Sequence, residues 1–281
     1  MDLRDAALRD VIAASADRLS PSERLVADAV AADPSAVAFG TVASVAERAG
    51  VSGPTVVRLA AKLGYDGFPG MQARVQEELA NRLRPAAERI RQRESSDVLG
   101  RTLATSVANV TATLERADRK AFARSGELLA DPKRTVFVLA GDATAGIAST
   151  VAADLHELRD AVVLLYGAPT TVARTMVDMT RGDVLLVIEV RRYERWVLDA
   201  TADARSRGAH VIAVTDSLVS PLAEGAAATF VVDAEGAGPF DSHVATLALG
   251  GALVAEVATR RRRTATARLD RVEAAQAHLL S

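Results

Sequence analysis

The sequence contains no cysteine, and this absence removes several kinds of chemistry at once. A chain without thiols has no disulfide framework, no thiol nucleophile and no thiolate metal site. Only four histidines are present, and they are too scattered along the chain to form a metal site. We therefore expect no bound metal and no cofactor.

Long apolar runs are also missing. No stretch reaches eighteen apolar residues without a charged residue, so no membrane-spanning helix is expected. The first ten residues, MDLRDAALRD, are acidic and amphipathic and lack the cationic-then-apolar order of a signal peptide. These observations predict a cytoplasmic protein without a membrane partner.

The composition that remains is typical of a folded chain, since 49% of the 281 residues are apolar and 25% are charged. This length suits two domains or one large domain. The formal net charge of −2 does not by itself indicate nucleic-acid binding. A two-domain regulator can confine its basic surface to one small face, however, so net charge scarcely tests that function.

The stretch from Thr41 to Gly64 has the pattern of two short helices joined by a tight turn. Gly50 is expected to end the first helix, and Ser52 is expected to cap the second. The residues at buried-stripe spacing are Val42, Val45, Ala46 and Ala49, followed by Val56, Leu59, Ala60 and Leu63. Two such helices have the build of a DNA-reading helix-turn-helix.

The other side of the second helix carries a hydroxyl and two cations, Thr55, Arg58 and Lys62. Arg58 and Thr55 lie early on this helix and are the expected base contacts, because Arg suits guanine. Ser52, Lys62 and Tyr65 are the expected phosphate contacts, which position a protein on DNA without reading its sequence.

Three positions leave alternatives open. Lys62 also fits an ordinary solvated helix face. Val57 is placed to touch a thymine methyl group, but packing is the favoured interpretation. Gly53 is expected to permit a close backbone approach.

The chain on both sides of this stretch is helical. Ser20 to Glu23 matches a capping box that opens a helix ending at Asp33–Pro34. Met71 to about Ile90 forms a further helix, and the polar gap Arg93–Asp97 is the expected hinge. The predicted domains are a helix-turn-helix domain with its exit helix at 1–94, a helical linker at 95–130, and an effector and oligomerisation domain at 131–281.

Beyond residue 130 the periodicity changes. Five short runs rich in Val, Ile and Leu alternate with helical segments, as in a parallel sheet covered on both faces. The runs are 135–140, 161–165, 184–188, 210–214 and 229–232, and the helices are 145–159, 195–207, 221–227 and 242–259. The expected fold class is an N-terminal all-α helix-turn-helix domain followed by an α/β domain with a five-stranded parallel sheet.

Helices are expected on either side of the sheet region. Residues 98–130 have a helical pattern with Leu99, Leu103 and Val107 in one apolar stripe. The tail 260–280 is also helical and starts with four consecutive arginines, which most often form a solvated helix end.

Ligands of an open parallel sheet bind at the carboxyl ends of its strands. The first strand ends at Gly141, where small residues let backbone N–H groups face an anion; a tight turn without a ligand is the alternative. The third ends in a loop with Arg191, Arg192 and Tyr193, which suits an anionic ligand; a solvated or subunit-facing loop is the alternative. The fourth strand ends beside Ser217.

At this point the chain resembles the RpiR (MurR/RpiR) family of bacterial transcriptional regulators. The resemblance rests on VASVAERAGVSGPTVVRLAAKLGYDGFPGMQ near the N-terminus, and on GDVLLVI, RGAHVIAVTD and SPLA further along. It implies a helix-turn-helix domain followed by a sugar isomerase (SIS) domain that senses phosphosugars.

Two loops depart from the family pattern. SIS domains that bind phosphosugars usually carry Ser-x-Ser-Gly-x-Thr after the third strand, whereas Glu189–Arg195 contains no Ser, Thr or Gly. The first loop also lacks its usual Ser, and Thr144 is the nearest substitute. Related isomerases move protons with a His and a Glu; His243 is a candidate effector contact, but without the phosphate loop it does not make an isomerase.

These observations together predict a homodimeric or homotetrameric transcriptional regulator that binds a palindromic double-stranded operator. Its SIS domain is expected to bind a small anionic metabolite such as a phosphosugar, with no catalytic residue. The alternatives are an SIS-fold sugar-phosphate isomerase with an appended helical domain, and an SIS domain that serves only for oligomerisation.

Overall fold

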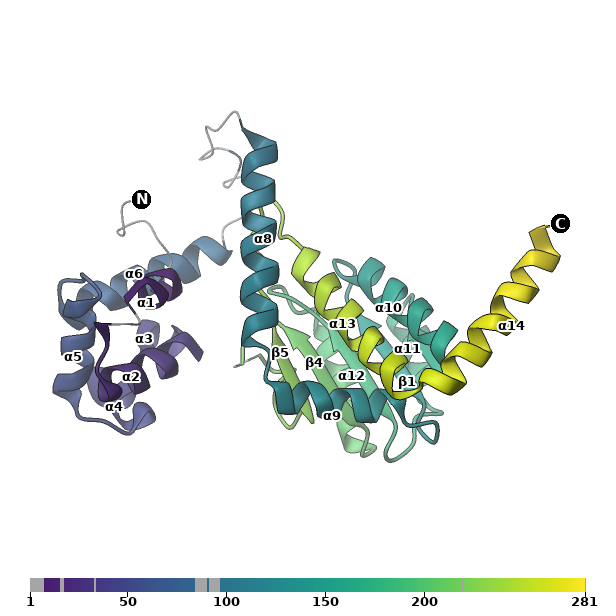
Figure 1. The fold of residues 1–281 in the computed structure, drawn as a ribbon. Helices are drawn as coiled ribbons and strands as arrows, with labels where there is room; N and C mark the ends of the chain where they lie inside the picture. Colours follow the sequence, from purple (N-terminus) through teal and green to yellow (C-terminus); the bar gives the residue numbers. More distant parts are fainter. Residues whose placement is uncertain are drawn as a thin grey trace. The chain divides into compact units, whose positions relative to one another are not determined.

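The computed structural model describes residues 8–15, 18–32, 34–83, 90, 97–218 and 220–280 (Figure 1). The chain divides into two compact units, Met1–Glu88 and Arg89–Ser281. The expected hinge lies outside the described residues except for Asp97. None of the helices within the described ranges is long and apolar enough to cross a bilayer.

The first unit is a bundle of short helices around one apolar core. Its described helices are α1 (Leu8–Ser15), α2 (Pro21–Ala32), α3 (Pro34–Phe39), α4 (Val42–Ala49), α5 (Gly53–Lys62) and α6 (Gly67–Leu83). The two helices predicted within Thr41–Gly64 are confirmed as α4 and α5, and their apolar stripes pack into this core. Two starts were not predicted: Pro34 opens α3, since proline is tolerated in a first helical turn, and α6 begins at Gly67.

Local capping explains where these helices begin and end. The predicted box is confirmed, because Ser20 N–H donates to Glu23 Oε2 at 2.8 Å and Glu23 N–H to Ser20 Oγ at 3.4 Å. A second box joins Thr41 and Ser44 at the start of α4. Gly50 ends α4 in the left-handed conformation, with φ of 65°, which favours glycine.

The second unit is built on a five-stranded parallel sheet, as predicted. Its strands are β1 (Val136–Ala140), β2 (Val162–Leu165), β3 (Val184–Ile188), β4 (His210–Thr215) and β5 (Ala228–Val231), in the order β2-β1-β3-β4-β5. Every residue of β1 and β3 is buried. These continuous apolar strands are the ones that a sheet covered on both faces requires.

Helices cover both faces of this sheet (Figure 1). On one face, α9 (Arg119–Ala130), α10 (Ala145–Leu158) and α13 (Val244–Arg260) share a core with Val136, Val138 and their neighbours. On the other face, α11 (Pro169–Met176) and α12 (Arg195–Ser206) share a core with Phe137 and Leu139. The alternation of inward residues along β1 therefore divides the core into two layers.

Two helix predictions differ from the structure, and one helix was not predicted. The pattern over 98–130 is two helices, α8 (Val98–Arg116) and α9, because Asp118 caps a new start by accepting from Lys120 N at 2.6 Å. The helix expected over 221–227 is a series of turns. The helix α11 was not predicted.

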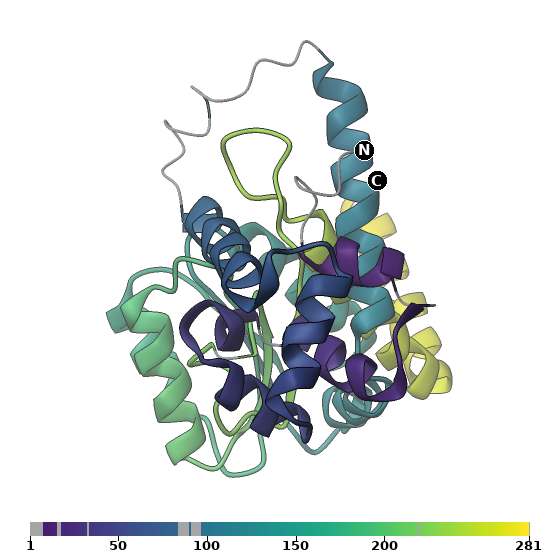
Figure 2. The ribbon, with the colours of Figure 1, turned by 90° about the vertical axis from the view of Figure 1, so that its left-hand side faces the viewer.

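The N-terminal half of α8 extends beyond the sheet (Figures 1 and 2). Its lower half is anchored by the connection from β5 to α13, since Asn109 Nδ2 donates to Glu235 O at 2.7 Å and Asp233 N to Thr113 Oγ1 at 2.9 Å. The upper half is not covered: Leu103 is 67% exposed, and Leu99 and Val107 are exposed as well. The predicted apolar stripe of Leu99, Leu103 and Val107 is therefore exposed in the single chain.

Candidate functional site

The outward face of α5 has a different composition from the one predicted. Its exposed residues include Pro54, Val57, Arg58 and Ala61, which share the i, i+3, i+4, i+7 spacing of one helix face. Thr55 is only 4% exposed, so its placement on the outward face was wrong. The packing role favoured for Val57 was also wrong, because this side chain is 42% exposed.

The buried hydroxyl of Thr55 instead holds Arg58. Arg58 Nη2 donates to Thr55 Oγ1 at 3.0 Å, and Thr55 Oγ1 lies 3.1 Å from Ser52 Oγ. Ser52 occupies the cap position of α5 but makes no side-chain capping bond, since its hydroxyl pairs with Thr55. The expected cap is therefore wrong in its chemistry, and the three side chains form a hydrogen-bonded row that ends in an exposed guanidinium.

Lys62 does not extend freely into solvent. Its Nζ donates to Glu23 Oε2 at 2.7 Å, and the Glu23 side chain is 8% exposed. The hydrogen bond from Lys62, followed by the one from the Ser20 backbone, lowers the pKa of Glu23 to about 2. This ion pair ties α5 to α2, while Tyr65 is half-buried against the helical core.

In the second unit, a carboxylate occupies the turn after β1. Gly141 N–H donates to Glu189 Oε2 at 2.7 Å, and Glu189 is 2% exposed. Asp142 N–H donates to Glu194 Oε1 at 2.6 Å. A Cβ at Gly141 would lie 2.5 Å from Glu189 Oε2 and 2.6 Å from Glu194 Oε1, so a larger residue here would displace both carboxylates. Backbone amides expected to face an anion thus face the chain's own carboxylates.

Burial dominates the electrostatics of Glu189. It raises the pKa of this carboxyl to about 7, and the nearby carboxylates of Glu194 and Asp142 raise it further against the lowering effect of the backbone donors. Glu194 is itself held by Trp196, whose Nε1 donates to Glu194 Oε2 at 2.5 Å. The turn after β1 therefore faces two carboxylates, Glu189 from the end of β3 and Glu194 from the start of α12.

The cations predicted at the third strand end are partly neutralised. Arg191, with φ of 64°, pairs with Asp241 through Nη1 and with Glu235 through Nη2 at 3.4 Å. The Tyr193 hydroxyl donates to Asp216 Oδ1 at 2.6 Å, and burial followed by Asp216 raises the pKa of Tyr193 to about 12. Arg192, by contrast, is exposed.

The remaining predicted effector contacts lie around this edge. Thr144 is buried and donates from Oγ1 to Ile188 O at 2.8 Å, so its hydroxyl is committed to the sheet. Ser217 is half-buried just after β4. His243 stands at the cap of α13, where burial and then Arg191 lower its pKa against the raising effect of Asp241.

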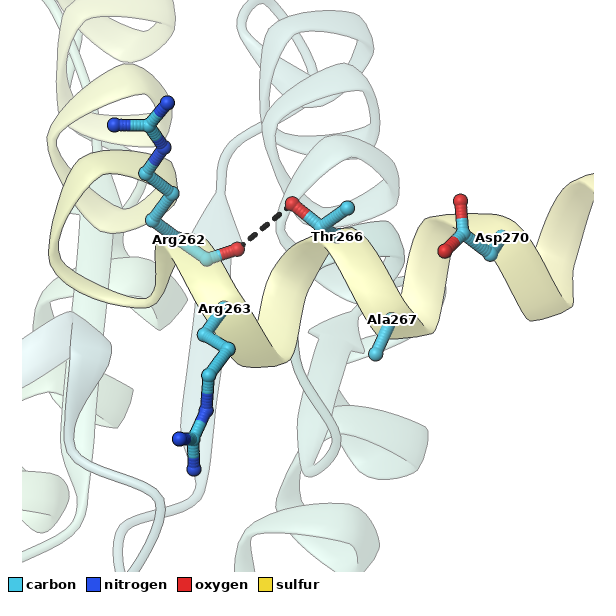
Figure 3. Close-up of a pocket in the computed structure, with 5 residues that line it drawn as sticks. All are labelled: Arg262, Arg263, Thr266, Ala267 and Asp270. Atoms are coloured by element: carbon cyan, nitrogen blue, oxygen red, sulfur yellow. Dashed lines mark hydrogen bonds between the residues drawn. The ribbon is translucent and has the colours of Figure 1, made fainter.

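Two hollows lie on the second unit. The smaller, about 100 Å³, lies at the carboxyl ends of β1 and β2 and is lined in part by Ala140, Asp142, Leu165, Tyr166 and Trp196. The larger, about 470 Å³, lies along α14 (Arg262–Leu280). Figure 3 shows that its five lining residues come from this one helix, with Thr266 Oγ1 donating to Arg262 O at 2.8 Å. A hollow lined by a single helix has no opposing wall, so only the smaller one belongs to a candidate ligand edge.

Comparisons with known proteins match both units. A family model described as "Helix-turn-helix domain, rpiR family" matches residues 7–82, and one described as "SIS domain" matches residues 128–256. The chain is 27% identical over 221 residues to the HTH-type transcriptional regulator HexR of Escherichia coli K12, covering 77% of this chain and 74% of that protein.

Two solved structures share the fold. The sugar isomerase domain of an RpiR transcription factor from Sphaerobacter thermophilus is 28% identical with a TM-score of 0.58, and the match covers 62% of this chain and 97% of that one. Vibrio vulnificus NanR, solved in complex with ManNAc-6P, is 20% identical with a TM-score of 0.59, covering 97% of this chain and 99% of that one.

The raised pKa of Glu189 predicts a pH-dependent stability. Between an ordinary value of 4.5 and about 7, the folded chain keeps a proton that the unfolded chain releases, so the free energy of unfolding falls as pH rises through this window. Replacement by Gln removes this dependence. Between pH 5 and pH 8, the free energy of unfolding of the wild type should fall by about 1–3 kcal/mol more than that of Glu189→Gln.

Urea unfolding followed by fluorescence of Trp196, the single tryptophan, measures this difference in the second unit. The control is Glu157→Gln, at an exposed carboxylate on α10, which should follow the wild-type profile. Parallel pH profiles for the wild type and Glu189→Gln would contradict the prediction.

Proposed function

This chain belongs to the RpiR family of DNA-binding transcriptional regulators, and we propose that it reads its operator with α5 and answers to an anionic carbohydrate derivative bound by its SIS domain. The observation that carries the DNA part is the exposed face of α5 with Arg58 at its centre. Such a regulator acts on chromosomal DNA, in the cytoplasm.

Arg58 is the proposed base contact. It lies on the helix that a helix-turn-helix inserts into the major groove, and a guanidinium there pairs with guanine. Thr55 supports it from below: a hydroxyl 3.0 Å from Nη2 restricts the rotamers of Arg58 and lowers the entropy lost on binding. Ser52, Lys62 and Tyr65 remain the proposed phosphate contacts, with Lys62 sharing its charge with Glu23.

A palindromic operator requires a two-fold symmetric protein. We propose that the exposed stripe on α8 pairs with a second copy of the chain. Leu99, Leu103 and Val107 repeat every fourth residue, so they form a continuous apolar seam on one helix face. Pairing of the seams of two copies would remove these apolar side chains from water.

The effector is proposed to enter at the carboxyl edge of the sheet. NanR, which has the same fold, was solved with ManNAc-6P, and this supports a phosphosugar as the first class to test. An anion approaching Gly141 competes with Glu189 for the backbone N–H, while Arg192 is exposed at the same edge. The effector controls DNA binding only if it prefers one of two arrangements of the dimer.

We propose no enzymatic role. The loop Glu189–Arg195 contains no Ser or Thr to hold a sugar phosphate, and the hydroxyl of Tyr193 donates to Asp216. Glu189 is 2% exposed and accepts from the Gly141 N–H, so it is not presented to a sugar as an acid–base partner of His243. Turnover of a sugar phosphate by the purified chain would revive the isomerase alternative.

Replacing Arg58 by Ala should weaken operator binding by about 1–3 kcal/mol and relax the preference for guanine at one position of each half-site. Lys62→Ala should weaken binding to all sequences alike. Fluorescence anisotropy with an operator selected in vitro measures both effects. Arg263→Ala, at an exposed cation on α14, is the matched control. Unchanged affinity in both α5 variants would mean that the reading helix is misassigned.

Placing a charge on the α8 seam should separate the subunits. Leu103→Asp buries a carboxylate in the proposed interface, at a cost that exceeds what an exposed substitution incurs. Light scattering should give a dimeric or tetrameric mass for the wild type and for the control Ala153→Asp, an exposed position on α10, but a lower mass for Leu103→Asp. A monomeric wild type would refute the proposed pairing.

A phosphosugar that binds the folded SIS domain should raise its melting temperature in proportion to saturation. The titration compares N-acetylmannosamine 6-phosphate and glucose 6-phosphate with the same sugars lacking phosphate, in the wild type and in Arg192→Ala. Stabilisation should require the phosphate and should weaken in the variant. No stabilisation by any of them, with operator binding intact and insensitive to ligand, would leave the domain an oligomerisation module.

A further inference from the structure

Val57 is an exposed β-branched side chain in the middle of α5. It is 42% exposed, whereas Val56, the residue before it, is fully buried. Alanine favours the helix more than valine does, so a solvated position on this helix gains nothing from valine. Its exposure leaves this apolar side chain available for a contact outside the free chain.

The neighbours of Val57 define what that contact can be. Pro54, Arg58 and Ala61 share its exposed face, so one cation stands among apolar side chains. The hydroxyl of Thr55 is buried beneath this face. The face therefore offers a single strong donor and an apolar surface, with little capacity for other hydrogen bonds to bases.

The major groove presents one apolar feature on its base edges, the 5-methyl group of thymine. A side chain of aliphatic carbon discriminates thymine from the other bases through that methyl group alone. Val57 and Arg58 are consecutive on α5, so the directions of their side chains differ by the rotation of one helical residue. Side chains placed in this way are expected to reach neighbouring base pairs.

We propose that Val57 is a specificity-determining residue that contacts the thymine methyl group of a base pair adjacent to the one that Arg58 reads. This rests on the proposed function, because it requires α5 to enter the major groove. It adds a second sequence preference to the guanine preference of Arg58.

The test uses the full chain and duplexes selected by it from a random pool. Each thymine of the enriched sequence is replaced in turn by deoxyuridine, which removes the methyl group and leaves every hydrogen-bonding group in place. At one thymine of each half-site, wild-type affinity should fall by about fourfold, the equivalent of one buried methylene-sized group. Val57→Ala should bind the thymine and deoxyuridine duplexes equally, at the wild-type affinity for deoxyuridine.

Two controls separate this contact from a general weakening. Leu25→Ala removes another exposed apolar side chain of the same unit, 54% exposed on α2, and should respond to deoxyuridine as the wild type does. Arg58→Ala should bind less tightly yet keep the discrimination between thymine and deoxyuridine. Melting curves establish that each variant is folded.

The outcomes distinguish the two levels of the proposal. If no duplex is enriched, the proposed DNA reading itself fails. If a duplex is enriched but no thymine discriminates the wild type from Val57→Ala, the methyl contact is refuted while DNA reading by α5 stands.

Discussion

One hydrogen bond, from the backbone N–H of Gly141 to the buried carboxylate of Glu189, organises the carboxyl edge of the sheet, where the effector is proposed to bind. It follows from strand register: Ala140 pairs with Ile188, so the residues that come next, Gly141 and Glu189, emerge side by side. Glycine keeps this arrangement, because a Cβ at position 141 would displace the carboxylate. The buried carboxylate in turn needs these backbone donors, since an unpaired charge at this depth would be costly. Neither residue is explained without the other.

The same pairing of charged and polar groups recurs on the DNA-reading unit. Lys62 is held by Glu23, and Arg58 is held by Thr55, so both cations predicted on α5 are oriented before any DNA is present. Orientation in advance limits the side-chain entropy lost on binding. The pairing of Lys62 with the buried carboxylate of Glu23 also limits the cations available on the proposed DNA-reading face of α5. On that face, Arg58 alone stands among apolar neighbours.

Periodicity in the sequence was sufficient to predict the helices and strands that have a strong apolar repeat. The helices α4 and α5 and all five strands were predicted, since burial on one stripe or on both faces leaves a clear apolar repeat. The orientation of α5 was not predicted, because Thr55 and Val57 lie at the border of the apolar stripe. The polar Thr55 is buried and the apolar Val57 is exposed, the reverse of what their polarity suggests. Similarly, Arg191 was correctly placed at a strand end, but its partner Asp241 lies fifty positions away, and local spacing contains no information about such a pair.

The ligand edge also suggests how an effector signal would begin under the proposed function. An anion that takes the amides of Gly141 and Asp142 displaces both Glu189 and Glu194. Glu194 is the residue directly before α12, and it holds the indole of Trp196 in the first turn of that helix. Displacement would free the start of α12 and would remove from Glu189 its shorter donor, leaving the backbone N–H of Glu194 at 3.4 Å. Under the proposed function, the buried carboxylate would then take up a proton or move toward water. Regulation requires in addition that this change differ between two arrangements of the dimer, so that the effector prefers one of them.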